Sequence, residues 1–358
     1  MIRTFHNVGQ GAFYTEEFNG MTMVYDCGGS NKHIIEASIR NTFERGQKID
    51  KLFISHFHND HINGLEFLLS YCNVSKVYLP LLHEKSEIQF LIENTIFGGG
   101  NSFVADLITD PENTIREASE ETGVIRVKPI NNDLINDSAE NKIRDNFILS
   151  GDEIPLNHSI DDCKWVLVPY NFQYDIFNAE LCTALENDDI DIHNIAVELR
   201  DKQKRIVEIY KSVLRGSNNF NANSLVLYSG AKENQVCDIE CFIENNSQYA
   251  PYWRFRVLKS GCLYLGDYNV SNQSVMDDLR VQYGRYWDNI NTVQIPHHGS
   301  KYNFNMDLVD ENTLAVISAG EGRRHPHAST LKKIIMKKAI VSVVTEDIDT
   351  KIIQRVYT

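Results

Sequence analysis

Histidine and aspartate side chains gather in residues 55–61, which read Ser-His-Phe-His-Asn-Asp-His. If this segment is extended, alternate side chains point the same way, so His56 and His58 project to one side. Where the chain then bends, Asp60 and His61 can reach a second point close by. Imidazole and carboxylate groups at this density suit zinc, iron or manganese. The segment therefore predicts a metal site.

Two later apolar runs also end in side chains that bind metals. Residues 262–265 lead into Asp267, and residues 292–295 lead into His297 and His298. Both runs predict strands, as does the apolar run 51–55 before the first segment. Each candidate ligand thus follows the C-terminal end of a predicted strand, where one edge of a sheet can gather all of them.

The elements that must position these side chains alternate along the chain. Runs rich in β-branched and aromatic residues predict strands at 22–25, 51–55, 76–79, 165–168, 224–228, 253–258, 262–265, 292–295, 314–318 and 339–345. Residues 253–265 predict a hairpin that turns at 259–261. Helical patterns cover 32–45, 65–71, 84–97, 102–122 and 179–216. We expect one layered α/β domain over residues 1–358, with helical insertions at about 84–150 and 171–216.

Charge and composition limit the possible partners. The chain of 358 residues has 35 Lys and Arg against 49 Asp and Glu, a net charge of −14. Such a surface repels nucleic acid and anionic lipid, so an anionic substrate needs a local metal or a small basic pocket. No run approaches the roughly 20 apolar residues of a membrane helix, and the N-terminus has no signal-peptide pattern. With seven scattered cysteines, we expect a cytoplasmic protein with reduced thiols and no membrane contact.

Taken in order, His-x-His-x-Asp-His at 56–61, Gly-Asp at 266–267 and His-His-Gly-Ser at 297–300 resemble the metallo-β-lactamase superfamily. The chain looks most similar to the branch that contains the nuclease-like domain of the DNA-uptake protein ComEC. That similarity rests on four further segments: 8–11 (VGQG), 24–29 (VYDCGG), 223–227 (NSLVL) and 317–327, which contains ISAG and HPH.

The resemblance implies an αββα sandwich, in which two sheets face each other and two metals lie at one edge. Carried over by motif, His56 and His58 bind the first metal, whereas Asp60 and His61 bind the second. Asp267 would bridge both ions. Superfamily members often read Gly-His-Gly in the last motif, and this alignment makes His298 a metal ligand and leaves His297 to face the substrate.

One departure from the superfamily pattern concerns the first metal. Many members carry another histidine for it on a strand between the first motif and the Gly-Asp pair. The corresponding strand here, 165–169, has none, and we interpret the nearby His158 as an exposed loop residue. The first metal is therefore expected to be held weakly, or to be completed by water and substrate.

The implied activity is metal-dependent hydrolysis, and we favour a phosphodiesterase or nuclease with two zinc or manganese ions. Two such ions about 3.5–4 Å apart share and activate a hydroxide. Asp60 would orient this hydroxide, while His297 and His325 would contact a phosphate oxygen or protonate the leaving group. Local positive charge could come from three late residues: Lys301, Arg323 and Arg324.

Two alternatives remain open at this point. The same ligands could hydrolyse another small ester or a thioester. The chain could instead be a module of a multi-protein system that retains the metal site and binds a protein partner through its helical insertions. Redox chemistry is disfavoured, because di-iron members of the superfamily place glutamate where His58 stands and no flavodoxin-like domain follows.

Overall fold

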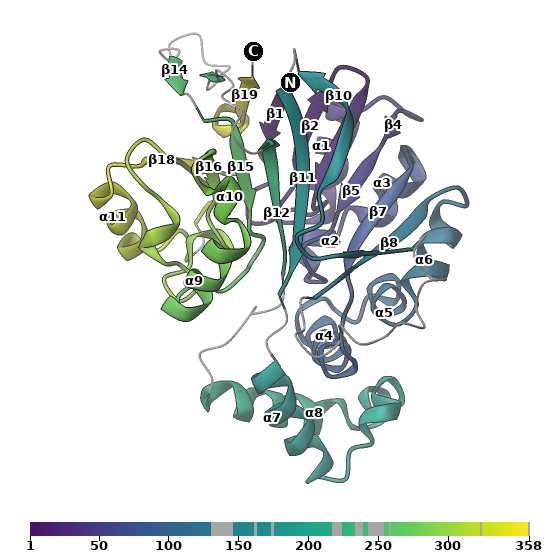
Figure 1. Ribbon diagram of the computed structural model, residues 1–358. Coiled ribbons are helices and arrows are strands. Elements are labelled where there is room, and N and C mark those ends of the chain that lie inside the picture. Colours follow the sequence, from purple (N-terminus) through teal and green to yellow (C-terminus); the bar gives the residue numbers. More distant parts are fainter. Residues whose placement is uncertain are drawn as a thin grey trace, which may run out of the picture.

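The computed structural model describes residues 1–129, 146–160, 163–172, 175–216, 224–232, 239–242, 254–257, 259–322 and 324–356. Two β-sheets face each other, and helices cover their outer faces, so the layers run helix, sheet, sheet, helix (Figure 1). This arrangement confirms the predicted αββα sandwich.

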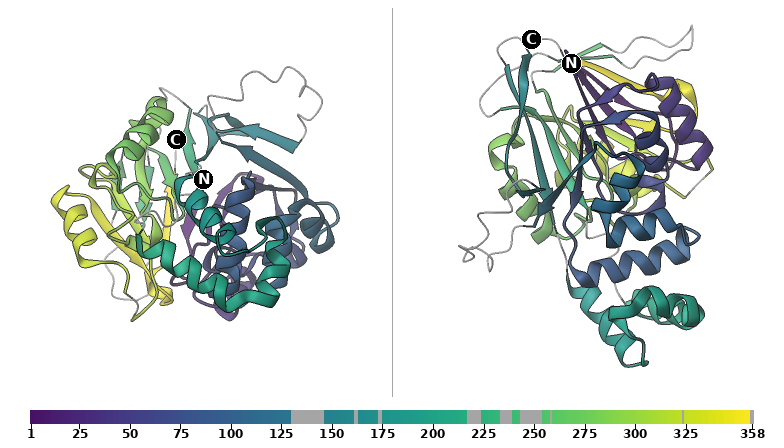
Figure 2. Two further views of the ribbon diagram at one scale, coloured as in Figure 1. Left: turned by 90° about the horizontal axis from the view of Figure 1, so that it is seen from below. Right: turned by 90° about the vertical axis from the view of Figure 1, so that its right-hand side faces the viewer.

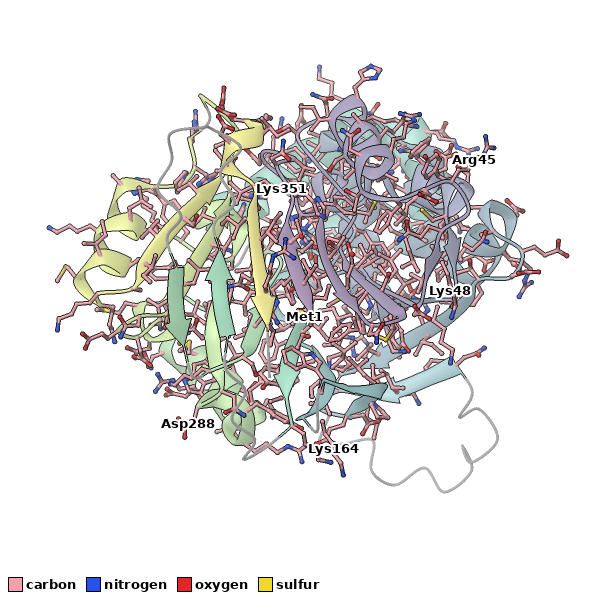
Figure 3. All side chains as sticks on the ribbon, turned by 90° about the horizontal axis from the view of Figure 1, so that it is seen from above. Met1, Arg45, Lys48, Lys164, Asp288 and Lys351 are labelled. Carbon is pink, nitrogen blue, oxygen red and sulfur yellow. The ribbon has the colours of Figure 1, made fainter. Side chains whose placement is uncertain are left out.

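The first sheet contains ten strands among the described residues. In spatial order they are β14 (Arg254–Val257), β13 (Ile239–Phe242), β19 (Ile352–Val356), β1 (Ile2–Phe5), β2 (Tyr14–Phe18), β3 (Met21–Tyr25), β5 (Lys51–Phe53), β7 (Lys76–Pro80), β8 (Gly123–Lys128) and β9 (Phe147–Leu149). From β3 to β9 the neighbours are parallel, so β3 and β5 end at the same edge. The first and last strands, β1 and β19, pair antiparallel and lie side by side near Met1 (Figure 3).

The second sheet has seven strands in the described part of the chain. Their order is β10 (Ile154–Ile160), β11 (Cys163–Asn171), β12 (Leu225–Ala231), β15 (Gly261–Tyr264), β16 (Ile290–Gln294), β17 (Leu314–Ser318) and β18 (Ile340–Val344). The four strands from β15 to β18 are parallel, so Asp267 and His297 follow strand ends at one edge. Two short strands, β4 (Lys48–Ile49) and β6 (Asn73–Val74), form a separate pair.

The predicted hairpin over residues 253–265 is wrong. Strand β14 pairs with β13 in the first sheet, whereas β15 lies in the second sheet between β12 and β16. Because β12 and β16 occupy both edges of β15, no edge is left for β14. The chain therefore crosses between the sheets at about residues 259–260.

The helices separate into those that cover the sheets and those that extend beyond one end of them. They are α1 (Lys32–Thr42), α2 (Asn59–Ile62), α3 (Leu65–Tyr71), α4 (Glu84–Phe97), α5 (Ser102–Thr109), α6 (Pro111–Ala118), α7 (Asp175–Glu186), α8 (Ile195–Gly216), α9 (Gln273–Gln282), α10 (Gly284–Trp287) and α11 (Ala328–Met336). Helices α4, α7 and α8 lie beyond the end of the sheets at which α2 is found, and both termini lie at the opposite end (Figures 1 and 2). None of the described helices is long and apolar enough to cross a membrane.

The expected helix over 102–122 is divided in two. The side chain of Asp110 accepts a hydrogen bond from the backbone N–H of Asn113, and Pro111 begins α6. Proline has no N–H and restricts the residue before it, so it starts a helix rather than continuing one. The helical part of segment 84–150 ends at Ala118, since β8 and β9 extend the first sheet.

Apolar side chains fill the space between the two sheets and the space under the helices. Along β3, Met23 and Tyr25 point into the cluster between the sheets, whereas Val24 points into the cluster beneath the helices. This alternation is the period of two that a strand imposes. Polar side chains therefore meet at two kinds of place: at the ends of the strands, and in a buried network between the sheets around the ion pair of Arg3 and Glu16.

Candidate metal centre

Backbone contacts join four strands of the two sheets at this edge: the ends of β5, β15 and β16 and the start of β12. The N–H of His297, after β16, donates to the carbonyl of Gly266, after β15, at 3.2 Å. The N–H of Leu225 donates to the carbonyl of Ser55, after β5, at 2.7 Å. A Cβ at Gly266, whose φ is +53°, would lie 2.6 Å from Cβ of Ser55, so only glycine allows this approach. The predicted convergence of the strand ends is therefore present.

Six of the predicted side chains form two adjoining triads. Within each triad, one ligand atom from each residue lies within 4.8 Å of the others. The first triad consists of His56, His58 and Asp267, and the second of Asp60, His61 and His298. His56 and His58 lie on the same side, as their spacing predicts, with His56 Nε2 and His58 Nδ1 3.0 Å apart.

The carboxylate of Asp267 lies between the two triads. Its Oδ2 is 3.7 Å from His56 Nε2, while its Oδ1 is 3.2 Å from His61 Nε2 and 3.9 Å from His298 Nε2. In the second triad, Asp60 Oδ2 lies 3.1 Å from His298 Nε2. One carboxylate thus presents an oxygen to each group of nitrogens, which is the geometry that a bridging ligand requires.

In each histidine of the triads, the ring nitrogen that points away from the triad makes a hydrogen bond with a neighbouring group. The outer contacts are His56 Nδ1 with Ser55 Oγ (2.9 Å), His58 Nε2 with Glu93 (2.7 Å), His61 Nδ1 with Asp26 (2.8 Å) and His298 Nδ1 with the Ser318 carbonyl (2.9 Å). Because the hydroxyl of Ser55 donates to Asp26, its oxygen accepts the proton of His56. In its neutral form each ring directs a lone pair inward, which is how metal-binding histidines are oriented. Burial opposes protonation, but the neighbouring carboxylates raise the pKa of His58, His61 and His298, so a bound metal would displace protons from these rings.

Asp26 is a residue beside the triads that the motif analysis did not single out as a site residue. It directly follows β3, is fully buried and has a left-handed backbone with φ of 56°. Its carboxylate accepts from the Ser55 N–H and hydroxyl as well as from His61. The sequence did contain a signal for Asp26, because it is a polar residue just after an apolar strand. Ser55 and Asp267 also lie shortly after strands that end at this edge.

The electrostatics of the cluster favour cation binding. Burial alone would raise the pKa of Asp267, but His297, His61 and His298 hold it well below its usual range. Burial likewise opposes ionisation of Asp60, yet the neighbouring His298 and His61 lower its pKa. Both carboxylates are therefore ionised at neutral pH. Nε2 of His61 is buried and lies 3.2 Å from Oδ1 of Asp267 without a hydrogen bond between them. These nitrogen and oxygen donors therefore fit a divalent metal.

The two adjacent histidines of the last motif have different surroundings. His297, His298 and Gly299 all have positive φ, and a Cβ at Gly299 would lie 2.8 Å from that of Pro326. This backbone, unfavourable for the two histidines, turns both rings toward the cluster. The side chain of His298 is 4% exposed and sits in the second triad, whereas that of His297 is 27% exposed. His297 Nε2 lies 4.0 Å from Asp267 Oδ2, and its Nδ1 contacts Asn303.

His325 stands beside His297, with ring centroids 5.7 Å apart. Burial, together with His297 and His298, lowers the pKa of His325 to about 4. We therefore expect its ring to stay neutral above about pH 5 and to become charged only as the pH falls through 4. Histidine-selective NMR during a pH titration, with the signal assigned by its loss in His325→Gln, measures this pKa. A midpoint near the ordinary value of 6.5 would contradict the environment described here.

Several residues that the sequence analysis considered lie outside the cluster or outside the described part of the chain. Residues 165–169 lie in β11, so the predicted strand is present there. His158 lies in strand β10 rather than in a loop, and its side chain is outside the described part of the structure. Lys301 and Arg324 are exposed, with Lys301 Nζ 4.7 Å from the ring of Tyr302, while Arg323 is outside the described residues.

Two facing sheets with outer helices and a histidine–aspartate cluster at one edge constitute the metallo-β-lactamase fold. A family model described as "Metallo-beta-lactamase superfamily" matches residues 16–131, which include the first motif but not Asp267 or His298. This match supports the superfamily resemblance predicted from the motifs.

Relatives among curated proteins match over a short stretch. The ribonuclease Z proteins of Bacillus thuringiensis (strain Al Hakam) and Bacillus cereus (strain B4264) are each 41% identical over 63 residues. The matched stretch covers 18% of this chain and 19% of each relative, so it spans about a fifth of their length. These relatives are of the ribonuclease Z type, and the finer resemblance to ComEC remains a prediction.

Solved structures resemble the chain over most of its length, at low similarity. The short form of human tRNase Z has a TM-score of 0.38 and 11% identity, with 96% of this chain and 92% of that chain covered. A diphosphatase from the PhnP family has a TM-score of 0.34 and 10% identity, with 94% and 73% covered.

Proposed function

We propose that this protein is a metal-dependent hydrolase that cleaves phosphodiester bonds, with two divalent ions, zinc or manganese, in its centre. The observation that carries the proposal is the carboxylate of Asp267, which presents one oxygen to each of two triads. In this assignment His56 and His58 would hold the first ion, and Asp60, His61 and His298 would hold the second. Asp267 would be available to both.

The residues of the chain have separate roles in the proposed reaction. Two bound ions would lower the pKa of a water between them and stabilise negative charge on the substrate. Asp60, which is less enclosed than Asp267, would orient that water while it binds the second ion. His297 and His325, which lie beside the triads, would donate hydrogen bonds to a phosphate oxygen, and His297 is our candidate for protonating the leaving group.

A phosphodiester is favoured over other esters for two reasons. The relatives that share 41% identity over 63 residues are named ribonuclease Z, and the late motifs resemble a nuclease-like branch. The net charge of −14 argues for a confined site in which the metals attract the anionic substrate, rather than for a broad basic groove. We infer further that residues 1–358 form one domain in which α4 to α6 and α7 with α8 are insertions.

The experiment is a substrate panel with the purified full chain, loaded with Mn²⁺ or Zn²⁺. Single-stranded DNA, duplex DNA, RNA and bis-p-nitrophenyl phosphate test for phosphodiesterase activity, and p-nitrophenyl acetate tests for general esterase activity. We expect cleavage of at least one phosphodiester, abolished by a chelator and restored by the metal. Metal occupancy near two without cleavage of any phosphodiester would reject the proposed function.

A further inference from the structure

A buried carboxylate connects the helical insertions to the first triad. Glu93, in α4, is 2% exposed, and its Oε2 lies 2.7 Å from His58 Nε2. Its Oε1 accepts two further hydrogen bonds, from the amide of Gln89 at 2.8 Å and from the hydroxyl of Tyr210 at 2.6 Å. Tyr210 belongs to α8, which is in the other insertion, 117 residues away in the chain.

Helices α4 and α8 pack through one apolar cluster, so this contact lies inside an apolar interface. Ile92 and Tyr210 are both fully buried members of that cluster. A charged group in such a place is costly unless all its hydrogen bonds are made. Apolar side chains would join the two helices at lower cost, and the carboxylate therefore calls for a role beyond packing.

We propose that Glu93 and Tyr210 are positioning residues through which the second helical insertion controls metal binding at the first triad. This inference rests on the proposed function, because it assumes that the triads hold metals. The hydroxyl of Tyr210 fixes Oε1 of Glu93, and Oε2 then accepts the Nε2–H of His58. His58 is thereby held in the tautomer whose Nδ1 lone pair faces His56 and Asp267.

The two triads explain why His58 needs this support. Among the described residues, the second triad offers two histidines and Asp60 in addition to Asp267, whereas the first offers two histidines and Asp267. A carboxylate that accepts the outer N–H of a histidine makes its inner nitrogen a stronger donor. His61 has this support from Asp26, next to it in the fold, but His58 obtains it from an insertion.

The decisive variant is Glu93→Gln, which keeps the shape and removes the charge. Oε1 of Glu93 already accepts from Gln89 and Tyr210, so the amide oxygen of the variant would stay there and its NH₂ group would face His58. His58 Nε2 would then have to accept, which moves the ring proton to Nδ1, the atom that faces the metal. We expect the affinity of one of the two sites to fall roughly 10- to 100-fold and that of the other to stay unchanged.

Tyr210→Phe is the second variant, because it removes one hydroxyl and leaves Glu93 in place. We expect a smaller loss at the same site. Tyr286→Phe is its matched control: that hydroxyl also donates to a glutamate, Glu153, at 2.6 Å, and the ring is also fully buried. No member of the triads contacts Glu153 in the described structure, so metal affinity should not change in this control.

Zn²⁺ affinities of both sites are measured by competition with a chromophoric chelator, and the visible spectrum of the Co²⁺-substituted protein reports which coordination changes. Unchanged affinities in Glu93→Gln and Tyr210→Phe would overturn the inference, as would equal losses at both sites together with a lower unfolding temperature without metal. If Glu93→Gln does not fold, the inference is tested by comparing the Zn²⁺ affinities of Tyr210→Phe with those of the control Tyr286→Phe. A wild-type chain that binds no metal would instead overturn the proposed function itself.

Discussion

Asp267→Ala is expected to lose both metal ions and nearly all hydrolytic activity. The carboxylate presents one oxygen to each triad, so its removal takes a ligand from both sites at once. It also leaves His56, His61 and His298 facing one another without the anion that lies among them. We expect a decrease in turnover on the order of a thousandfold or more, because the charge that stabilises the reacting phosphate is lost with the ions.

The measurement combines elemental analysis of metal per chain with turnover of bis-p-nitrophenyl phosphate. Asp267→Asn keeps the size of the side chain and replaces one oxygen by a donor, so it should lose at least one ion. Asp277→Ala, at an exposed aspartate of α9, is the control and should retain both ions and full activity. If Asp267→Ala keeps two ions per chain, Asp267 does not bridge the two triads.

Most of the cluster could be predicted from the sequence because its members follow apolar runs. A strand buried on both faces must be apolar, so a histidine or aspartate within a few residues of its end marks the edge of the sheet. His56, Asp267 and His298 all follow this pattern. The two outer carboxylates did not stand out: Asp26 was visible only as part of a motif, and Glu93 is one acidic residue of a helix.

Glu93 could not be found because its partners lie far apart in the chain. It is 35 residues from His58 and 117 residues from Tyr210, and no local spacing connects them.

The incorrect hairpin at 253–265 has a similar cause. Two adjacent apolar runs fit a hairpin locally, but in the folded chain β15 is hydrogen-bonded to β12 on one edge and to β16 on the other. The division between α5 and α6 could have been predicted from the sequence, because Asp110 is an N-cap residue and Pro111 is a residue that starts a helix.

His297 and His298 are adjacent, yet we expect their alanine variants to fail in different ways. His298 Nε2 lies 3.1 Å from Asp60, and its Nδ1 is held by the Ser318 carbonyl, so its ring is a fixed member of the second triad. His298→Ala should therefore lose one ion per chain. His297 is more exposed, is held by Asn303 and stands beside His325, which suits contact with the substrate.

His297→Ala should keep both ions and lower turnover by about 100-fold or more, the usual contribution of a general acid or a phosphate contact. If His297 protonates the leaving group, the loss should be much smaller for a substrate with a good leaving group, such as p-nitrophenol, than for RNA or DNA. His33→Ala, at an exposed histidine of α1, controls for the loss of any histidine and should change neither quantity. If His297→Ala loses an ion while His298→Ala keeps two, the roles of the pair are reversed. His297, whose Nε2 lies 4.0 Å from Asp267 Oδ2, would then be the metal ligand of the pair, and His298 would be the one that faces the substrate.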